Sequence, residues 1–388
     1  MAGYVFLSNS SKPTKSELLS RDKVRFTNVS KPCLEIALEM GYKVYFGVNR
    51  TNPENLECDL PINLYDSHTY RSLTDLKSNI IAFNNLFRLV KKNNIEVIHC
   101  NTPIGGMIGR LVGKLLNVKK IIYTAHGFHF YKGAPLINNT VLKWAELLMA
   151  RWTDVIITMN KEDYMAAKKF KLRNKGNVYY IPGVGIDVNY YKNTKIDVEK
   201  KRAELGLDKN DFVLITVGDL VANKNIENLI KVISLLKQKN FKLLICGSGP
   251  EKSKLLKMTD ELKITDQIKF LGFRSDVNEL YKASDAFISI SKREGLPRVI
   301  MEAMASGLPC IVSNIRGNVD LVDNNKGGYV CDSDNLTSYT NAIYNLYSEK
   351  MLQKKFSEYN EKKILNYDVS IIKEKLRNIY EIELFERG

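Results

Sequence analysis

The sequence predicts an α/β protein built from two doubly wound domains, each with a parallel β-sheet between layers of helices. Short β-branched and aromatic runs alternate with helical patterns along the whole chain, which is typical of βα units around parallel sheets. At 388 residues the chain is also long for a single hydrophobic core. Two domains of ordinary size are therefore expected.

Each predicted strand is a short apolar run that stops where polar or turn residues begin. In the first half we expect strands at Tyr4–Ser8, Lys43–Val48, Glu96–Cys100, Lys120–Thr124, Asp154–Met159 and Asn177–Ile181. In the second half we expect them at Phe212–Val217, Lys242–Cys246, Ile268–Gly272, Asp285–Ser291, Cys310–Ser313 and Gly328–Cys331. A last helix is predicted from Val369 to Phe385, where apolar residues recur at helical spacing.

The domain boundary is expected after the segment Ile-Pro-Gly-Val-Gly-Ile-Asp at residues 181–187. One proline and two glycines punctuate the chain there, and the next twenty residues are polar. The predicted organisation is a first domain at 1–187, a second at 188–366, and a C-terminal helix at 367–388 that packs back on the first domain.

Composition restricts the class of protein. Six cysteines are scattered without paired spacing, which indicates reduced thiols and no zinc site. No run of about 18 apolar residues occurs, and the first apolar run is too short for a signal peptide. We expect no membrane span and no targeting segment.

The net charge of +15 is concentrated in the first half of the chain. Residues 1–190 contain 26 Lys and Arg against 15 Asp and Glu, and the remainder contains 32 against 28. Such a bias serves nucleic acid, anionic lipid or a phosphorylated substrate, with plain solubility as the alternative.

The most informative segment lies between Glu294 and Glu302. The first glutamate follows the predicted strand at 285–291, and the second falls about two turns into a helix. Backbone N–H groups at the start of that helix suit phosphates, and the flanking carboxylates suit hydroxyl groups. An ordinary helix start with an acidic first turn is the alternative for two glutamates alone.

This segment, Glu-seven-residues-Glu followed by Ala-Met-Ala-Ser-Gly-Leu-Pro, resembles the signature of the retaining glycosyltransferases of family 4. The resemblance covers nearly the whole chain. It implies the GT-B fold, in which two Rossmann-like domains face a central cleft. It also implies that Glu294 touches the transferred sugar and that Glu302 binds the nucleotide ribose.

The same resemblance assigns the donor diphosphate to a turn containing Gly218 and Lys224. A lysine there meets a diphosphate as a mobile point charge. Family members also carry an arginine where this chain has Asp219. Either Arg293 or Arg298 replaces that cation, or the leaving group is held mainly by Lys224 and backbone amides.

Other donor contacts come from later strand ends. Gly247 stands in a Gly-x-Gly-Pro turn that lines the donor side of the cleft in the family. Phe273 and Arg274 are expected beside the nucleobase, for which uridine is the commonest choice. Backbone N–H groups of three further residues are expected to meet the phosphates: Leu296, Arg298 and Val299. Pro297 has no N–H to offer.

In the first domain, His126 follows the predicted strand at 120–124 and precedes a glycine. Ligands of doubly wound folds bind outside the carboxyl ends of the strands, and the resemblance places this histidine near the transferred sugar. His129 is less clearly placed. The polar loop 9–17 replaces the Gly-Gly turn of relatives, which predicts an unusual acceptor entrance.

The sequence Asp332-Ser-Asp334 has the spacing of an Asp-x-Asp metal motif but is interpreted as a turn, so no metal is expected.

A helix with Trp144, Leu147, Leu148 and Trp152 is expected to bury most of these residues in the core. The basic residues that follow it are candidates for contact with an anionic membrane; they are Lys161, Lys168, Lys169, Lys171, Arg173 and Lys175.

The function that the resemblance implies is that of a retaining hexosyltransferase that needs no cofactor. Its donor is a nucleotide sugar, with UDP as the preferred carrier, and its acceptor a glycan on polyprenyl diphosphate, as in bacterial capsule, exopolysaccharide or O-antigen synthesis. The predicted place is the cytoplasm, peripheral on the inner face of the membrane. Alternatives are a GT-B sugar-nucleotide epimerase, a nicotinamide oxidoreductase, which lacks its three-glycine fingerprint here, and a nucleic-acid-binding protein, for which no module is present.

Overall fold

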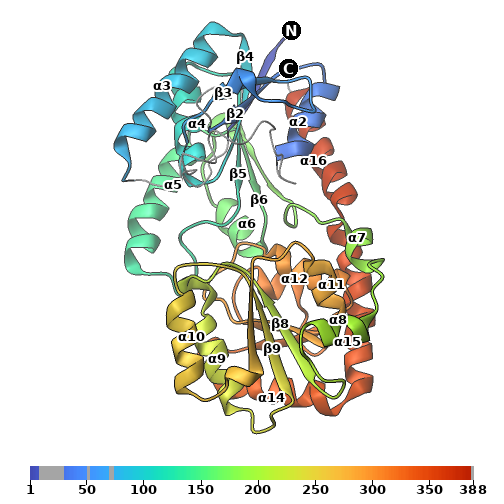
Figure 1. Ribbon diagram of the computed structural model, residues 1–388. Coiled ribbons are helices and arrows are strands. Elements are labelled where there is room, and N and C mark those ends of the chain that lie inside the picture. Colours follow the sequence, from blue (N-terminus) through green and yellow to red (C-terminus); the bar gives the residue numbers. More distant parts are fainter. Residues whose placement is uncertain (8–29, 50–52, 70–73, 386–388) are drawn as a thin grey trace. The chain divides into compact units, whose positions relative to one another are not determined.

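The protein is described by a computed structural model that covers residues 1–7, 30–49, 53–69 and 74–385 (Figure 1). It divides into two compact units. Unit 1 consists of Met1–Val184 together with Ile372–Gly388, and unit 2 of Gly185–Ile371. The C-terminal segment therefore belongs to the same unit as the N-terminus.

Unit 1 is built on a seven-stranded parallel sheet with the order β3-β2-β1-β4-β5-β6-β7. Its strands are β1 (Gly3–Leu7), β2 (Lys43–Val48), β3 (Asn63–Asp66), β4 (Ile95–Asn101), β5 (Lys120–Ala125), β6 (Val155–Thr158) and β7 (Asn177–Tyr180). Its main helices are α2 (Ser30–Glu39), α3 (Leu76–Lys92), α4 (Pro103–Leu115), α5 (Lys143–Ala150), α6 (Lys161–Ala167) and α16 (Val369–Leu384). A π-helical turn, η2 (Asn138–Leu142), leads directly into α5.

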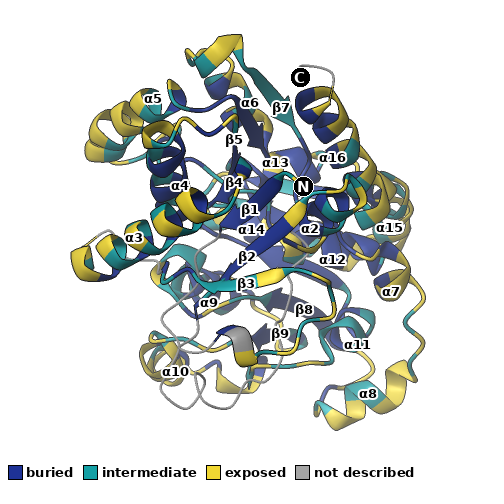
Figure 2. Cartoon of the chain, turned by 90° about the horizontal axis from the view of Figure 1, so that it is seen from above, coloured by how far each residue is buried: buried dark blue, intermediate teal, exposed yellow. Residues whose placement is uncertain are grey.

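Both faces of this sheet are covered, so its central strands are buried at nearly every position (Figure 2). Val5 and Leu7 of β1 face one cluster together with residues of α3 and α4. Tyr4 and Phe6 of the same strand face the other cluster, together with α2 and α16. The alternation along β1 thus separates two cores.

Helix α16 is fixed to the sheet by a buried polar network as well as by apolar contacts. The hydroxyl groups of Tyr4 and Tyr380 lie 3.0 Å and 2.5 Å from Nδ1 of His99, and Thr124 Oγ1 lies 2.7 Å from its Nε2. Burial lowers the pKa of His99 to about 3, which keeps the imidazole neutral. Because Tyr380 comes from α16, this network ties the two ends of the chain into one core.

Unit 2 is built on a six-stranded parallel sheet with the order β10-β9-β8-β11-β12-β13. Its strands are β8 (Phe212–Val217), β9 (Phe241–Cys246), β10 (Ile268–Gly272), β11 (Ala286–Ser289), β12 (Cys310–Ser313) and β13 (Gly328–Cys331). Its helices are α7 (Val188–Lys192), α8 (Val198–Glu204), α9 (Ile226–Leu235), α10 (Lys252–Glu261), α11 (Val277–Lys282), α12 (Arg298–Ala305), α13 (Asn318–Leu321), α14 (Leu336–Ser348) and α15 (Lys350–Lys363). One core lies among α9, α14 and the sheet, and a second among α12, α11 and the opposite face.

The two doubly wound parallel sheets confirm the predicted fold class. Every predicted strand is present to within two residues at each end. The strand missed is β3, a half-exposed edge strand with the sequence Asn-Leu-Tyr-Asp. The unit boundary falls after Val184, beside the boundary of 187 expected from the sequence, and α16 ends at Leu384.

One expectation was wrong. The helix carrying Trp144 and Leu148 does not bury them, because Trp144 is 75% and Leu148 49% exposed, and α5 buries only Ala150 completely. The side of α5 that faces the unit instead carries Glu146, whose carboxylate pairs at 2.8 Å with the fully buried Arg110 of α4. The apolar side of this helix points outward.

All six cysteine thiols are free; five of them are buried, and Cys58 is half-buried. Among the described residues, no helix combines the length and the apolar character that crossing a bilayer requires.

Candidate active site

The predicted donor residues of unit 2 follow β8, β9, β10 and β11, on the loops at the carboxyl edge of the sheet and on the first turns of α12. The first two loops are in direct contact. A Cβ on Gly247 would lie 1.9 Å from the carbonyl oxygen of Gly218, so only glycine fits there. This close approach explains why the Gly-x-Gly turn after β9 needs its first glycine.

Lys224 and Glu294 form the central contact of the site. Lys224 closes the turn η4 (Ala222–Lys224) before α9, and Glu294 lies in the loop between β11 and α12. Lys224 Nζ lies 2.8 Å from Glu294 Oε1, with side-chain exposures of 23% and 13%. The predicted diphosphate-binding cation and the predicted sugar-binding carboxylate are therefore brought together.

The loop that carries Glu294 is held from two sides. On one side, Asn223 donates from Nδ2 to the carbonyl oxygen of Arg293 (2.8 Å) and accepts from the backbone N–H of Lys292 (2.9 Å). On the other, the nearly buried Arg316 donates from Nε to the carbonyl oxygen of Glu294 (3.2 Å). The carboxylate thus starts from a backbone fixed by two neighbouring loops.

Glu302 lies on the second turn of α12 and is nearly buried. Its Oε1 accepts a hydrogen bond from Nε of Arg298 at 2.9 Å, one helical turn earlier. Its Oε2 lies 3.3 Å from the hydroxyl of Tyr281, whose pKa is raised by burial and by the nearby carboxylate. Tyr281 therefore remains a hydrogen-bond donor that orients the glutamate.

The start of α12 can hold an anion. Pro297 is the N-cap residue, and Arg298 is the first residue of the helix. The first N–H groups of a helix have no carbonyl partner within it, and the helix dipole places positive charge there. The backbone of Arg298 and Val299, with Leu296 just before them, can therefore donate to phosphate oxygens.

Phe273 and Arg274 follow β10 and are placed differently from each other. Phe273 is 86% exposed, so its ring is accessible for stacking on a nucleobase. Arg274 is already paired with Asp276, with Nε 2.7 Å from Oδ1. This ion pair holds the pKa of Asp276 below its ordinary range, so the carboxylate stays charged and holds the guanidinium of Arg274.

His126 lies directly after β5, at the carboxyl edge of the sheet of unit 1, and is half-buried like His129. The loop that follows is anchored, because the backbone N–H of Phe128 donates to Asp163 Oδ2 at 3.0 Å and Asn138 Nδ2 donates to the carbonyl oxygen of His129 at 2.8 Å. The predicted acceptor loop 9–17 lies outside the described residues.

Two residues bear on the predicted cationic clamp. Asp219, which stands where relatives have an arginine, is exposed. Of the two candidate replacements, Arg298 is engaged with Glu302. The sequence prediction missed Arg316, which reaches Glu294 from the loop after β12. In the sequence, Arg316 stands three residues after β12 and just before Gly317, and a cation at a strand end was the signal that could have identified it.

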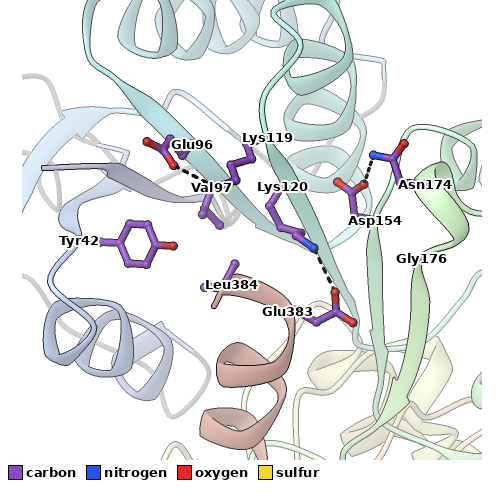
Figure 3. Close-up of a pocket in the computed structure, with 10 residues that line it drawn as sticks. All are labelled: Tyr42, Glu96, Val97, Lys119, Lys120, Asp154, Asn174, Gly176, Glu383 and Leu384. Atoms are coloured by element: carbon purple, nitrogen blue, oxygen red, sulfur yellow. Dashed lines mark hydrogen bonds and ion pairs between the residues drawn. The ribbon is translucent and has the colours of Figure 1, made fainter. Parts of the chain in front are cut away.

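A polar hollow lies at the amino edge of the sheet of unit 1, opposite to the edge that carries His126 (Figure 3). It has a volume of about 230 Å³ and is lined by the amino ends of β4 and β5 and the end of α16. Its polar side chains pair with one another: Lys120 Nζ lies 3.1 Å from Glu383 Oε2, and Asn174 donates to Asp154 at 3.1 Å. The contact between Lys120 and Glu383 anchors α16 to β5.

Asp332 and Asp334 form the turn after β13, where the backbone N–H of Asp334 lies 3.5 Å from Asp332 Oδ1. In the described ranges, no group of three or more His, Cys, Asp or Glu side chains is arranged to hold a metal ion. The polar groups of the site are cations, carboxylates and backbone amides, which suit a ligand with both phosphates and hydroxyls.

Two family models match this chain. Residues 197–363 match the model described as glycosyl transferases group 1, and residues 33–160 match the model described as glycosyl transferase 4-like. The first match contains Gly218, Lys224, Glu294 and Glu302, and the second contains His126.

Characterised and putative relatives share most of the chain. It is 30% identical over 307 residues to the putative glycosyltransferase EpsD of Bacillus subtilis, covering 78% of this chain and 80% of the relative. It is 28% identical over 313 residues to an Escherichia coli enzyme named UDP-Gal:alpha-D-GlcNAc-diphosphoundecaprenol alpha-1,3-galactosyltransferase, covering 79% and 80%.

Solved structures show the same fold. The protein HepE of Anabaena, in complex with UDP and glucose, superposes with a TM-score of 0.76 at 19% identity, covering 98% of this chain and all of that one. The sucrose-phosphate synthase of Thermosynechococcus elongatus superposes with a TM-score of 0.79 at 18% identity, with both chains fully covered.

Proposed function

Since the chain belongs to the family-4-like glycosyltransferases of the GT-B fold, we propose that it moves a hexose from a uridine-diphosphate sugar to a glycan carried on polyprenyl diphosphate. The product belongs to a bacterial surface polysaccharide, and the anomeric configuration of the donor is retained. The contact that carries the proposal is the pairing of Lys224 with Glu294 beside the start of α12.

The charges around this ion pair fit a diphosphate. Its negative charge is attracted to Lys224 and to the backbone amides at the start of α12, and it competes with Glu294 for the lysine. Glu294, released from that pair, is then available to the hydroxyls of the sugar. Glu302 is held by Tyr281 and Arg298 in an orientation that can accept hydrogen bonds from a ribose diol.

Retention of configuration is proposed with the leaving diphosphate assisting attack from the same face. The chemistry then depends on stabilising the charge that develops on the departing phosphate, which is the task of Lys224 and the helix start. His126, at the carboxyl edge of the sheet of unit 1, is proposed as a hydrogen-bonding partner of the sugar in the reacting complex. No metal ion is required in this scheme.

The acceptor is proposed from the relatives and from charge. EpsD and the galactosyltransferase of Escherichia coli are both similar over about four fifths of their length, and the name of the second states a diphosphoundecaprenol acceptor. The basic excess of the first half favours a substrate that carries phosphates at an anionic membrane. We therefore place the enzyme on the cytoplasmic face of the cell membrane.

One experiment tests donor, acceptor and reaction type together. The purified protein is incubated with a panel of nucleotide sugars, with and without a polyprenyl-diphosphate glycan, and both nucleotide release and glycan mass are followed. The expected result is UDP release and a glycan heavier by one hexose, unchanged by a chelator, with the donor's anomeric configuration preserved by NMR. Glu294→Gln is the matched inactive control.

Other outcomes assign other functions. Release of UDP and free sugar without an acceptor, at the full rate, indicates the sugar-nucleotide epimerase. Consumption of a nicotinamide cofactor indicates an oxidoreductase, and loss of activity with a chelator overturns the metal-free scheme.

A further inference from the structure

The outward face of η2 and α5 is apolar although it belongs to an otherwise polar surface. Four residues form a stripe at spacings of four, three and four, which places them on one side of a helix. They are Ile137 (63% exposed), Val141 (60%), Trp144 (75%) and Leu148 (49%). The residue that precedes the stripe, Leu136, is also exposed.

The packing of α5 shows that this orientation is fixed. The opposite side of the helix holds Glu146, whose carboxylate binds the buried guanidinium of Arg110 through two hydrogen bonds of 2.8 Å and 3.2 Å. Rotating α5 to bury Trp144 would remove Glu146 and leave Arg110 as an unpaired buried charge. The chain therefore uses a buried ion pair to present apolar side chains to the outside.

A cavity adjoins the stripe. It has a volume of about 320 Å³ and is lined by aromatic and aliphatic side chains together with three lysines, which are Lys132, Lys143 and Lys169. Phe130 and Phe170 form part of its wall. An apolar hollow bordered by lysines suits an amphiphile with a negatively charged head.

The charges around the stripe favour an anionic partner. Between residues 132 and 175 the sequence has nine basic residues and four acidic ones. Three of the acids are turned inward: Asp154 and Asp163 are buried, and Glu146 is paired with Arg110. Only Glu162 is exposed. A second copy of this chain would bring like charges together, whereas a surface of anionic lipid would complement them.

We propose that η2 and α5 form an interfacial membrane-docking element that inserts the stripe of Ile137, Val141, Trp144 and Leu148 into an anionic phospholipid bilayer. Tryptophan is the side chain best suited to the boundary between headgroups and acyl chains. The lysines of the adjoining cavity face the lipid phosphates. The cavity is lined by Tyr131 and Lys132, which belong to the same loop as His126. The element therefore anchors the edge of unit 1 that carries His126.

The inference rests on the proposed function only for the nature of the acceptor, and its test measures membrane binding alone. The chain contains two tryptophans, Trp144 and Trp152. Trp152 is half-buried beneath Lys114, whose Nζ lies 4.3 Å from the ring centre. In a Trp152→Phe background, the fluorescence of Trp144 therefore reports its environment directly.

The expected results are specific to anionic lipid. Vesicles of phosphatidylcholine with phosphatidylglycerol should shift the emission of Trp144 to shorter wavelength, and brominated acyl chains should quench it, whereas phosphatidylcholine alone should do neither. Replacing Val141, Trp144 and Leu148 by Gln in the full chain should lower vesicle binding at least about tenfold. Replacing Lys132, Lys143 and Lys169 by Gln should remove the preference for phosphatidylglycerol.

A matched control comes from the same unit. Leu76 and Ile80 are also exposed apolar residues on a helix, α3, and replacing both by Gln should leave vesicle binding unchanged. UDP binding and thermal unfolding verify that each variant is folded.

Two outcomes overturn the proposal. One is unchanged vesicle binding by the Val141, Trp144 and Leu148 variant. The other is a dimer in sedimentation that the same variant dissociates, with no emission shift of Trp144 on vesicles, which would assign the stripe to self-association. A protein that binds vesicles as expected but transfers no sugar overturns the proposed function and leaves this inference intact.

Discussion

The ammonium group of Lys224 and the carboxylate of Glu294 lie 2.8 Å apart, although 70 residues separate them in the chain. The contact joins the turn after β8 to the loop after β11. It predicts that the two residues are energetically coupled in donor binding, because each is the other's partner until a diphosphate takes the lysine.

Glu294→Gln is expected to reduce sugar transfer strongly while binding of free UDP stays equal or becomes tighter, because Lys224 loses its competing partner. Lys224→Met is expected to weaken UDP binding by about 1.5–3 kcal/mol, the usual range for hydrogen bonds to charged groups. Calorimetry on both single variants and the double variant gives the coupling energy. Strictly additive effects on UDP binding would show that the ion pair plays no part in it.

Glu302→Ala is expected to weaken both UDP and the donor sugar nucleotide by about 1.5–3 kcal/mol, since a charged acceptor for the ribose diol is removed. Tyr281→Phe is the matched control. It keeps the carboxylate but removes the hydroxyl 3.3 Å from Oε2, and should weaken UDP by less. Unchanged UDP affinity in a folded Glu302→Ala protein would contradict the ribose assignment.

Arg316→Gln is expected to lower the transfer rate by at least about tenfold, because small displacements of a reacting group are costly. Arg316 acts through the backbone of Glu294, so the affinity for free UDP should change less than turnover. Arg316→Lys should not restore the rate, since lysine has no Nε donor in the same position. Full rescue by lysine would show that only the positive charge matters.

His126→Ala is expected to lower turnover much more than UDP affinity, because its proposed contact forms only in the reacting complex. Steady-state kinetics and UDP calorimetry on the same preparation separate the two effects. His129→Ala, a change two residues away in the same anchored loop, is the control. Equal turnover of the His126→Ala protein and the wild type would reject His126 as a site residue.

The buried His99 predicts a pH dependence of stability. Its folded pKa of about 3 lies below the ordinary value of about 6.5, so unfolding takes up a proton when the pH lies between these two values. The free energy of unfolding should therefore fall as the solution is acidified, by about 2 kcal/mol between pH 6.5 and pH 5 from this group alone. Chemical denaturation of the wild type and of His99→Asn checks this, and equal slopes would contradict it.

Sequence patterns predicted twelve of the parallel strands well because each of these is a mainly apolar run bounded by polar or turn residues. β3 escaped notice because only two of its four residues, Leu64 and Tyr65, are apolar, and its two ends, Asn63 and Asp66, are polar. The outward stripe of α5 was misassigned to the core for a related reason. Helical spacing reveals that Val141, Trp144 and Leu148 share a side, but which side faces inward depends on Arg110, which lies in another helix.

In the candidate site too, local patterns were readable from the sequence and contacts between distant elements were not. Glu294 and Glu302 were identifiable because one local block carries both. The pairing of Glu294 with Lys224 and the support from Arg316 could not be read from spacing, since they depend on the order in which β8, β11 and β12 stand in the sheet.

The course of the chain at residues 184–186 and 367–372 has a consequence for biosynthesis. Ile186 and Asp368 are paired as a β-bridge, so the ends of unit 2 lie side by side and the unit can close on itself as soon as its last residue has been made. Unit 1 is different, because Ile372, Leu376, Ile379 and Tyr380 complete a core begun by Tyr4 and Phe6. Unit 1 therefore starts before unit 2 in the chain but completes its core after it, and a truncation before α16 would remove the packing partners of Tyr4 and Phe6.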